Sequence, residues 1–220
     1  MATALVTGAN RGIGLELCRQ LVARKWQVIG VCRNASPELT ALGVKVETGV
    51  DVSDGRAVDG LARRLEGTRL DLLINNAGLL ISDRLERLEL DAVTRQLEVN
   101  AIGPLLITAR LVGLLGAGSK VALITSRMGS IADNTSGGMY GYRMSKAALN
   151  AAGVSLARDL EARQIAVVIL HPGFVRTEMT HGSGNVDVAE AARGLLARID
   201  ELTLEKTGRF LHANGEELPW

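Results

Sequence analysis

The sequence predicts a three-layer α/β/α fold, in which a doubly wound parallel sheet of about seven strands carries helices on both faces. Short apolar runs alternate with amphipathic stretches along the whole chain, which is the rhythm of βαβ units. Most of these runs are continuous Val, Ile, Leu and Ala, as expected for parallel strands that are covered on both faces. A glycine-rich turn follows the first run, where such a sheet can bind an anion.

The elements follow from these patterns in order. The expected strands are 2–7, 26–32, 44–50, 70–75, 119–126, 165–171 and 208–212. The expected helices are 12–25, 54–66, 91–116, 141–163 and 188–199. No linker, repeat or low-complexity tract separates them, so we expect residues 1–220 to form a single domain. The polar, glycine-rich segment near 174–187 is expected to be a short loop over the substrate.

The composition excludes several classes of protein. The chain has 220 residues, 47% of them hydrophobic, and a net charge of +1 without basic or acidic blocks, so nucleic-acid and membrane-surface partners are not expected. The N-terminus enters a strand directly, unlike a signal peptide, and no apolar run approaches the length of about 18 residues that a membrane span needs. We therefore expect a cytoplasmic protein with Cys18 and Cys32 reduced. No Cys/His cluster has zinc-site spacing, so no metal is expected.

The turn after the first strand has the features of a dinucleotide loop. In Thr7–Gly14, Gly8 allows a tight turn, Gly12 allows backbone to approach a pyrophosphate, and Gly14 allows close packing of helix on strand. The helix that follows offers unpaired N–H groups and its positive dipole end to the phosphates. An ordinary tight turn between strand and helix is the alternative. The residues expected to contact the cofactor here are Gly8, Asn10, Arg11, Gly12, Ile13 and Gly14.

The end of the second strand predicts which dinucleotide binds. An NAD site of this type has an acidic residue about 20 residues after the glycines, where it holds the ribose 2′-hydroxyl. This chain has Cys32, Arg33 and Asn34 there instead. An arginine suits a 2′-phosphate, which a carboxylate would repel, and Arg11 could reach the same group. The pattern therefore favours NADP(H) over NAD(H).

A tyrosine and a lysine four residues apart predict a general acid/base. Tyr142 and Lys146 lie one turn apart on one face of an expected helix. An ammonium close to the phenol could lower the tyrosine pKa by up to about three units, before burial is counted. Tyr140 competes for the role, but the residue four positions after it is Met144, so Tyr142 is the expected acid/base and Tyr140 a wall of the pocket.

Taken together, these motifs resemble the short-chain dehydrogenase/reductase family, whose Rossmann-type fold they imply. The similarity runs from Thr3 to about Phe210, with the motifs in the family's order and spacing. The longer segment before Tyr142 and the ending Gly215–Trp220 look most like sniffer-like carbonyl reductases and C-factor proteins. The matching segments are the glycine loop Thr7–Gly14, Asp51 with Val52, Asn75–Gly78, Asn100, Ser126, Tyr142 with Lys146, and Pro172–Thr177.

The resemblance implies a role for each matching residue. Asn100, Ser126, Tyr142 and Lys146 would be catalytic, with Thr125, Ser130 or Ser136 as alternatives to Ser126. Asp51 would contact the adenine, and Thr177 the nicotinamide carboxamide or nearby phosphates. Besides the glycine loop and Arg33, the implied cofactor contacts are Asp51, Val52, Asn76, Ala77, Gly78, Tyr142, Lys146, Pro172, Gly173, Val175 and Thr177.

The function expected from the residues and the resemblance is NADP(H)-dependent reduction of an aldehyde or ketone to an alcohol. The alternative is a cofactor-binding regulatory or signalling protein of C-factor type, with catalysis secondary. Met139, Tyr140 and Phe174 are expected to line an open substrate pocket, while His171 is expected to be a packed strand-end residue. The apolar helical stretches 91–116 and 141–163 predict a homodimer or homotetramer, although some sniffer-like relatives are monomers.

Overall fold

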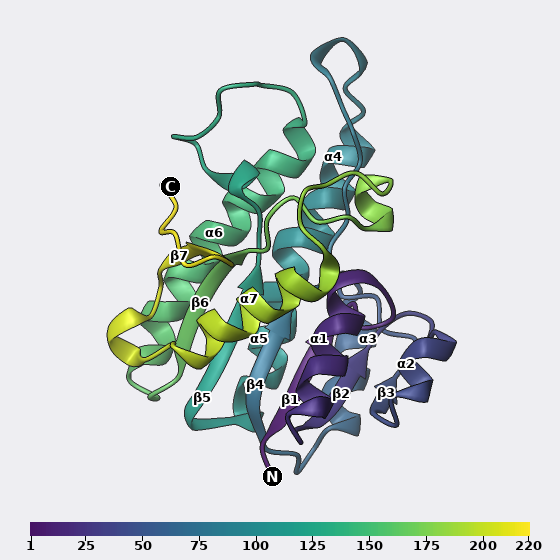
Figure 1. Cartoon of the computed structure of the whole chain (residues 1–220), viewed down its shortest axis with the longest axis vertical. Helices are drawn as coiled ribbons and strands as arrows, with labels where there is room; N and C mark the ends of the chain where they lie inside the picture. Colours follow the sequence, from purple (N-terminus) through teal and green to yellow (C-terminus); the bar gives the residue numbers. More distant parts are fainter.

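The computed structural model describes all 220 residues and contains one seven-stranded sheet (Figure 1). All strand pairs are parallel, and the strand order is β3-β2-β1-β4-β5-β6-β7. The predicted doubly wound α/β fold is therefore confirmed. The strands are β1 (Thr3–Thr7), β2 (Gln27–Val31), β3 (Lys45–Glu47), β4 (Leu70–Asn75), β5 (Leu115–Ile124), β6 (Ala166–His171) and β7 (Phe210–His212).

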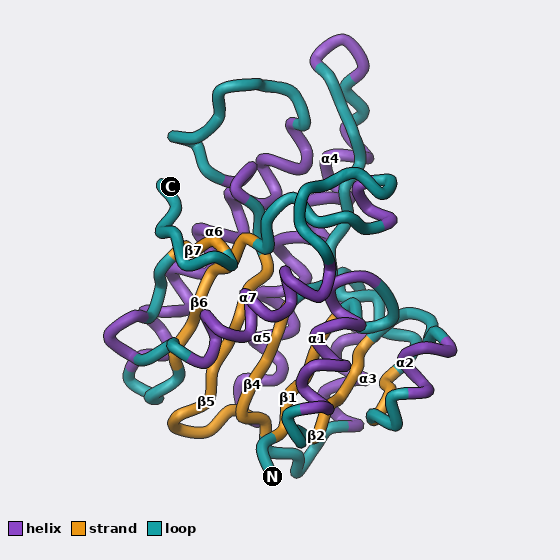
Figure 2. Tube along the Cα trace, viewed as in Figure 1, coloured by secondary structure: helices purple, strands orange, loops and turns teal.

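Helices cover both faces of the sheet. Figure 1 shows α1 and α7 in front of the strands, and α3, α5 and α6 pack on the opposite face. Figure 2 shows that the long loops gather at the end of the sheet where the strands finish. The helices are α1 (Gly12–Ala23), α2 (Pro37–Ala41), α3 (Gly55–Arg64), α4 (Leu90–Leu97), α5 (Gly103–Leu111), α6 (Tyr140–Glu161) and α7 (Val188–Asp200).

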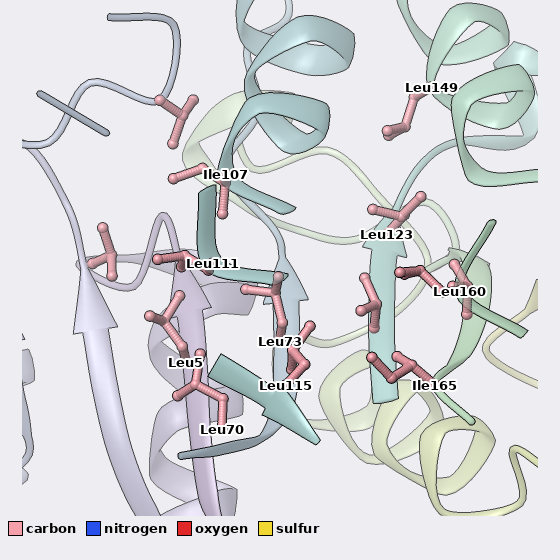
Figure 3. Close-up of a cluster of buried hydrophobic side chains, with 14 of the residues drawn as sticks. Leu5, Leu70, Leu73, Ile107, Leu111, Leu115, Leu123, Leu149, Leu160 and Ile165 are labelled. Atoms are coloured by element: carbon pink, nitrogen blue, oxygen red, sulfur yellow. The ribbon is translucent and has the colours of Figure 1, made fainter. Parts of the chain in front are cut away.

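The two hydrophobic cores explain why the strands are continuous apolar runs. Successive side chains of a strand point to opposite faces, so Leu73 joins the core beneath α3, α5 and α6, while Leu72 and Ile74 join the core beneath α1 and α7. Figure 3 shows the first core, where Leu73 and Leu123 of the sheet meet Ile107 and leucines of the covering helices. Strands β1 and β6 are buried along almost their whole length, so most positions of these strands are apolar.

The expected helix 91–116 is interrupted. Between α4 and α5 the chain forms a π-helical turn, Glu98–Ile102, and a 3₁₀ turn, Val112–Leu114, ends the helical stretch. Strand β5 then begins at Leu115, four residues earlier than the expected 119–126, in a bulged pairing with β4. The short helix α2 was not predicted, because its five residues are too few to show a helical period.

The helical stretch Leu90–Leu114 meets the length and composition of a membrane span, with a mean hydropathy of 1.4 over an 18-residue window. It is not the uninterrupted apolar run whose absence was expected, because polar residues such as Asn100 and Arg110 lie within it. Inside the protein, 44% of that window is buried, because α4 packs against α6 and α5 packs on the sheet. Packing thus accounts for part of the apolar character of this stretch.

Candidate active site

A cavity of about 430 Å³ lies where the chain reverses its direction across the sheet, between β1 and β4. In open parallel sheets such a crevice, at the carboxyl ends of the strands, is where ligands bind. Most of the predicted site residues line it. They are Gly8, Asn10, Arg11, Gly12, Ile13, Arg33, Asp51, Val52, Asn76, Ala77, Gly78, Tyr142, Lys146, Pro172 and Thr177.

The glycine loop forms a cradle whose walls leave no room for side chains. A Cβ on Gly8 would lie 2.9 Å from the Cα of Ala77, and Gly8 has a φ of +65°. A Cβ on Gly14 would lie 2.1 Å from the carbonyl oxygen of Gly8. Gly14 does not line the cavity, so its contribution is this packing rather than the predicted contact with the cofactor. Helix α1 begins at Gly12 without a side-chain cap, so its first N–H groups remain available to an anion.

The segment after β4 holds the glycine loop in place. The Asn76 side-chain amide donates to the carbonyl oxygens of Thr7 at 3.0 Å and Gly8 at 3.3 Å. The Thr7 hydroxyl in turn accepts from the backbone N–H groups of Asn76 and Ala77, both at 3.0 Å. These bonds join the first and fourth strands at the floor of the cavity.

The far end of the cavity is cationic. Arg33 follows β2 and forms no ion pair, and no carboxylate lies at that strand end. Arg11 pairs with Glu178 across the cavity. Asp51 accepts hydrogen bonds from Ser53 and, at 2.7 Å, from Arg95. Burial raises the pKa of Asp51, but these hydrogen bonds outweigh it and hold that pKa below its usual value.

Tyr142 and Lys146 meet at the other end of the cavity, on the first turns of α6. Their exposed fractions are 8% and 4%. The Lys146 Nζ lies 5.8 Å from the centroid of the Tyr142 ring and donates to the backbone oxygen of Ile124 at 2.9 Å. The ammonium therefore stands over the face of the ring and is anchored to the end of β5.

Burial controls the acidity of both groups. It raises the pKa of Tyr142 to about 12, although a hydrogen bond with Ser126 opposes this rise. Burial also lowers the pKa of Lys146 to about 8. The low tyrosine pKa considered from the Tyr142–Lys146 spacing, before burial is counted, is not the net result in this structure, because the loss of water around the phenol is the larger effect and Lys146 is also bound to Ile124.

Ser126 supplies the hydroxyl that opposes the rise in the pKa of Tyr142. It follows β5, and its Oγ accepts from the N–H of Met128 at 3.1 Å, which caps the 3₁₀ turn Arg127–Gly129. Thr125 instead bonds to an asparagine side chain on α6 at 2.7 Å. Ser130 accepts from the backbone of its own loop, and Ser136 accepts from an arginine on α6. The three alternatives to Ser126 are thus engaged elsewhere.

Asn100 lies in the π-helical turn and is fully buried. Its Nδ2 donates to the carbonyl oxygen of Leu79 at 2.7 Å and to the Ser145 hydroxyl at 2.9 Å, and its Oδ1 accepts from the Leu79 N–H at 2.7 Å. The side chain therefore ties the segment after β4 to α6, one residue before Lys146. Asn100 and Ser126 do not line the cavity itself.

The segment after β6 closes the cavity on one side. Pro172 and Thr177 line it, whereas Gly173 and Val175 do not; Val175 instead bridges to Val186 within the segment. Phe174 and Met179 are 54% and 39% exposed. His171, at the end of β6, packs edge-on against His212 with 4.9 Å between ring centroids, as expected of a packed strand-end residue. Burial lowers the pKa of His171 to about 3.

A family model described as short chain dehydrogenase matches residues 2–186. The chain belongs to this family. The match contains the glycine loop, Tyr142 and Lys146, which line the cavity, and Asn100 and Ser126, which do not. The protein is therefore an oxidoreductase of the short-chain dehydrogenase/reductase type.

Individual relatives agree with this membership. The chain is 42% identical, over the whole length of both proteins, to 1-hydroxy-2-glutathionyl-2-methyl-3-butene dehydrogenase of Rhodococcus sp. strain AD45. It is 46% identical over 154 residues to the C-signal protein of Myxococcus xanthus, covering 69% of this chain and 93% of that one.

Two solved structures are similar over the whole chain. The carbonyl reductase Sniffer of Drosophila melanogaster has a TM-score of 0.92 at 30% identity, with all of both chains covered. An NADPH-bound carbonyl reductase from chicken fatty liver has a TM-score of 0.91 at 29% identity, covering 100% of this chain and 99% of that one. The resemblance to sniffer-like reductases and C-factor proteins is thus confirmed.

Several residues that line the cavity of this short-chain dehydrogenase were not predicted. The main one is Arg95, which lies on helix α4 and donates a hydrogen bond to Asp51. In the sequence it is one of two arginines on the expected helix 91–116, and nothing marks it as facing inward. Glu178 directly follows Thr177 and could have been found from that position. The other unpredicted lining residues are Val31, Cys32, Asn34, Val50, Leu79, Val99, Ile124 and Met179, whereas Thr125, which also lines the cavity, was named as an alternative to Ser126.

Proposed function

We propose that this protein is an NADP(H)-dependent reductase that converts aldehyde or ketone carbonyl groups to alcohols. The observation that carries the proposal is the meeting of Tyr142 and Lys146 at one end of a cavity that is also lined by Arg33, with Ser126 next to Tyr142 outside the lining. Membership of the short-chain dehydrogenases and the likeness to two carbonyl reductases support it.

The residues present fit a dinucleotide. The cradle at Gly8 and Gly12 leaves the backbone and the start of α1 open to a pyrophosphate, which a side chain at Gly8 would obstruct. Asp51 and Lys146 both line the cavity, where Asp51 would hold the adenine and Lys146 the ribose hydroxyls. When bound, NADPH supplies the hydride for the carbonyl carbon. Similar solved structures with NADPH or NADP bound are those of two carbonyl reductases and of a short-chain dehydrogenase/reductase from Burkholderia multivorans.

Arginines support the preference for NADP(H) over NAD(H). Arg33 forms no ion pair with any carboxylate, so its guanidinium is available to a 2′-phosphate. Arg11 can add a second cation if it leaves Glu178, since both side chains are largely exposed. The end of β2 has no carboxylate, which an NAD site would use to accept a hydrogen bond from the ribose 2′-hydroxyl.

Tyr142 is suited to act as the general acid. With a pKa of about 12 its phenol is protonated at neutral pH, so it can give its proton to the carbonyl oxygen as the alcohol forms. Ser126 donates a hydrogen bond to the same oxygen and fixes its position. Lys146, with a pKa of about 8, remains mainly protonated near neutrality and stabilises the tyrosinate left behind. Asn100 keeps α6 in place against the segment after β4.

The same residues serve the reverse reaction, oxidation of an alcohol, with Tyr142 as base. The relative from Rhodococcus is named as a dehydrogenase of a hydroxy compound that carries a glutathionyl group. A panel that tests the proposal therefore includes both directions. NADPH consumption is measured with aldehydes, ketones, quinones and dicarbonyls, and NADP⁺ reduction with the corresponding alcohols. Turnover of carbonyl compounds is the expected result. Tight NADPH binding without turnover of any compound would contradict it.

A regulatory or signalling function is the second candidate. Similarity to the C-signal protein over 154 residues favours it. A protein with this function would still be expected to keep reductase activity, because the chain has the complete set of Asn100, Ser126, Tyr142 and Lys146. If the protein turns over no compound of this panel, the regulatory or signalling function becomes the favoured one.

Association through the long helices and a cytoplasmic location remain predictions. Ile102 and Leu105 on the α4–α5 stretch are 55% and 43% exposed, and Met144 on α6 is 51% exposed. Such apolar side chains favour a homodimer or homotetramer formed through these helices. Light scattering coupled to size-exclusion chromatography gives the mass, and a monomer at micromolar concentration would contradict the prediction.

A further inference from the structure

The helix that carries Tyr142 lacks a cap from its own sequence. The residue before α6, Met139, has a left-handed backbone with a φ of 53° and makes no side-chain cap bond. Two of the first N–H groups of the helix bind instead to one carboxylate from a distant loop. Asp83 Oδ1 accepts from the N–H of Tyr140, and Oδ2 accepts from the N–H of Gly141 at 2.8 Å. The backbone oxygen of Asp83 also accepts from the Met139 N–H at 3.2 Å.

The carboxylate of Asp83 is only 6% exposed and forms no ion pair. A buried charge needs compensation, and here the two N–H groups and the positive end of the α6 dipole supply it. The fit is close. A Cβ on Gly141 would lie 3.1 Å from Asp83 Oδ2 and 2.4 Å from the Nε2 of Gln96. Only glycine lets the helix start approach the loop this closely.

The loop that ends at Asp83 is itself fixed along its length. Gln96, which is fully buried, accepts from the N–H of Ile81 at 2.9 Å. Asn100 binds both backbone groups of Leu79 at 2.7 Å. The loop continues directly from Asn76–Gly78, which line the cavity. The position of the helix start is thus tied, through one carboxylate, to the segment that lines the proposed cofactor site.

We propose that Asp83 is a positioning residue for Tyr142, which it holds at the correct distance from the proposed cofactor site by capping α6 two residues before the tyrosine. This inference rests on the proposed function. A misplacement of about 1 Å caused far from the chemistry can lower a rate on the order of 100-fold. Loss of the cap should therefore reduce turnover more than it reduces cofactor binding.

The test compares Asp83→Ala and Asp83→Asn with Asp54→Ala. Asp54 caps α3 with the same kind of bonds, accepting from the N–H groups of Arg56 at 2.9 Å and Ala57 at 3.4 Å. Because Asp54 caps a helix that does not carry Tyr142, Asp54→Ala serves as the control for cap loss alone. For Asp83→Ala we expect kcat to fall about 10- to 100-fold while the Kd of NADPH stays within about twofold. For the control we expect a lower Tm and an unchanged kcat at saturating NADPH.

Asp83→Asn keeps one acceptor oxygen but turns an NH₂ group toward the second N–H. It should fold and recover part of the lost kcat, a graded response that a purely structural cap would not give. If kcat of Asp83→Ala stays within twofold of the wild type, the inference is overturned. Should Asp83→Ala not fold, Asp83→Asn decides by the same criterion.

Amide hydrogen exchange separates this inference from the proposed function. Asp83→Ala should speed exchange at the Tyr142 and Arg143 amides, and Asp54→Ala should not. If the wild type proves inactive on every carbonyl compound, the proposed function fails, but the exchange experiment still reports on the cap. Unchanged exchange in Asp83→Ala would overturn the positioning role.

Discussion

Replacement of Lys146 by methionine should stabilise the fold at neutral pH while it abolishes turnover. The ammonium is 4% exposed, faces no carboxylate, and makes one hydrogen bond, to the backbone oxygen of Ile124. A charge in such a place is destabilising, because it loses its water without gaining a counter-ion. Methionine has a similar length and carries no charge.

The magnitude follows from the pKa of Lys146, which burial lowers from 10.5 to about 8. At about 1.36 kcal/mol per pKa unit, the protonated folded state is penalised by about 3 kcal/mol. Because the folded state has the lower pKa, the unfolded chain binds more protons between pH 8 and 10.5. The penalty is therefore complete below about pH 8 and is lost as the pH rises toward 10.5, so that about 1 kcal/mol remains at pH 9.5.

The variant also leaves the Ile124 oxygen without a donor, which costs about 1–3 kcal/mol at every pH. The change with pH is therefore a sharper measure than the absolute gain. In urea denaturation, the stability difference between Lys146→Met and wild type should shrink by about 2 kcal/mol between pH 7 and pH 9.5. A difference that stays constant over this range would refute the account of a buried, destabilising cation at this position.

Two further predictions concern the proposed cofactor site. Arg33→Ala should weaken NADPH binding at least tenfold, which corresponds to about 1.4 kcal/mol or more. NADH binding should be unchanged when both are measured by fluorescence titration. Equal losses of affinity for the two cofactors would show that Arg33 does not bind the 2′-phosphate. Gly14→Ala places a Cβ 2.1 Å from the Gly8 oxygen, so the loop must shift and NADPH binding should be lost, with about 1–3 kcal/mol of destabilisation. Gly113→Ala, where a Cβ meets nothing within 4 Å, is the matched control, and loss of binding in this control would contradict the reasoning.

The sheet and the glycine loop could be predicted because their signals are local. Strands buried on both faces must be apolar at every position, and the turn at Gly8 needs a backbone that other residues rarely adopt. The pairing of Tyr142 with Lys146 was also readable, since helical spacing brings them to one face. The pKa values of the two groups could not be predicted, because the direction in which the pKa of Tyr142 shifts depends on how much water the folded chain excludes.

What the sequence could not predict depends on contacts between distant segments. Asp83 lies 57 positions before the helix that it caps, and no periodicity connects the two. The same holds for Arg95, which binds Asp51 across 44 positions. The π-helical turn at Asn100 has no composition signal, although such turns often occur at functional sites. These contacts are fixed by tertiary packing, which only the structure describes.

The most direct test of the central claim is turnover by Tyr142→Phe, which removes one hydroxyl from a buried ring. We expect NADPH to bind with a Kd within about twofold of the wild type, while carbonyl reduction falls by about 100-fold or more, as for loss of a general acid. Tyr140→Phe should retain measurable turnover, since no lysine lies four residues after it. Wild-type rates in Tyr142→Phe, or loss of turnover only in Tyr140→Phe, would contradict the assignment of Tyr142 as the proton donor.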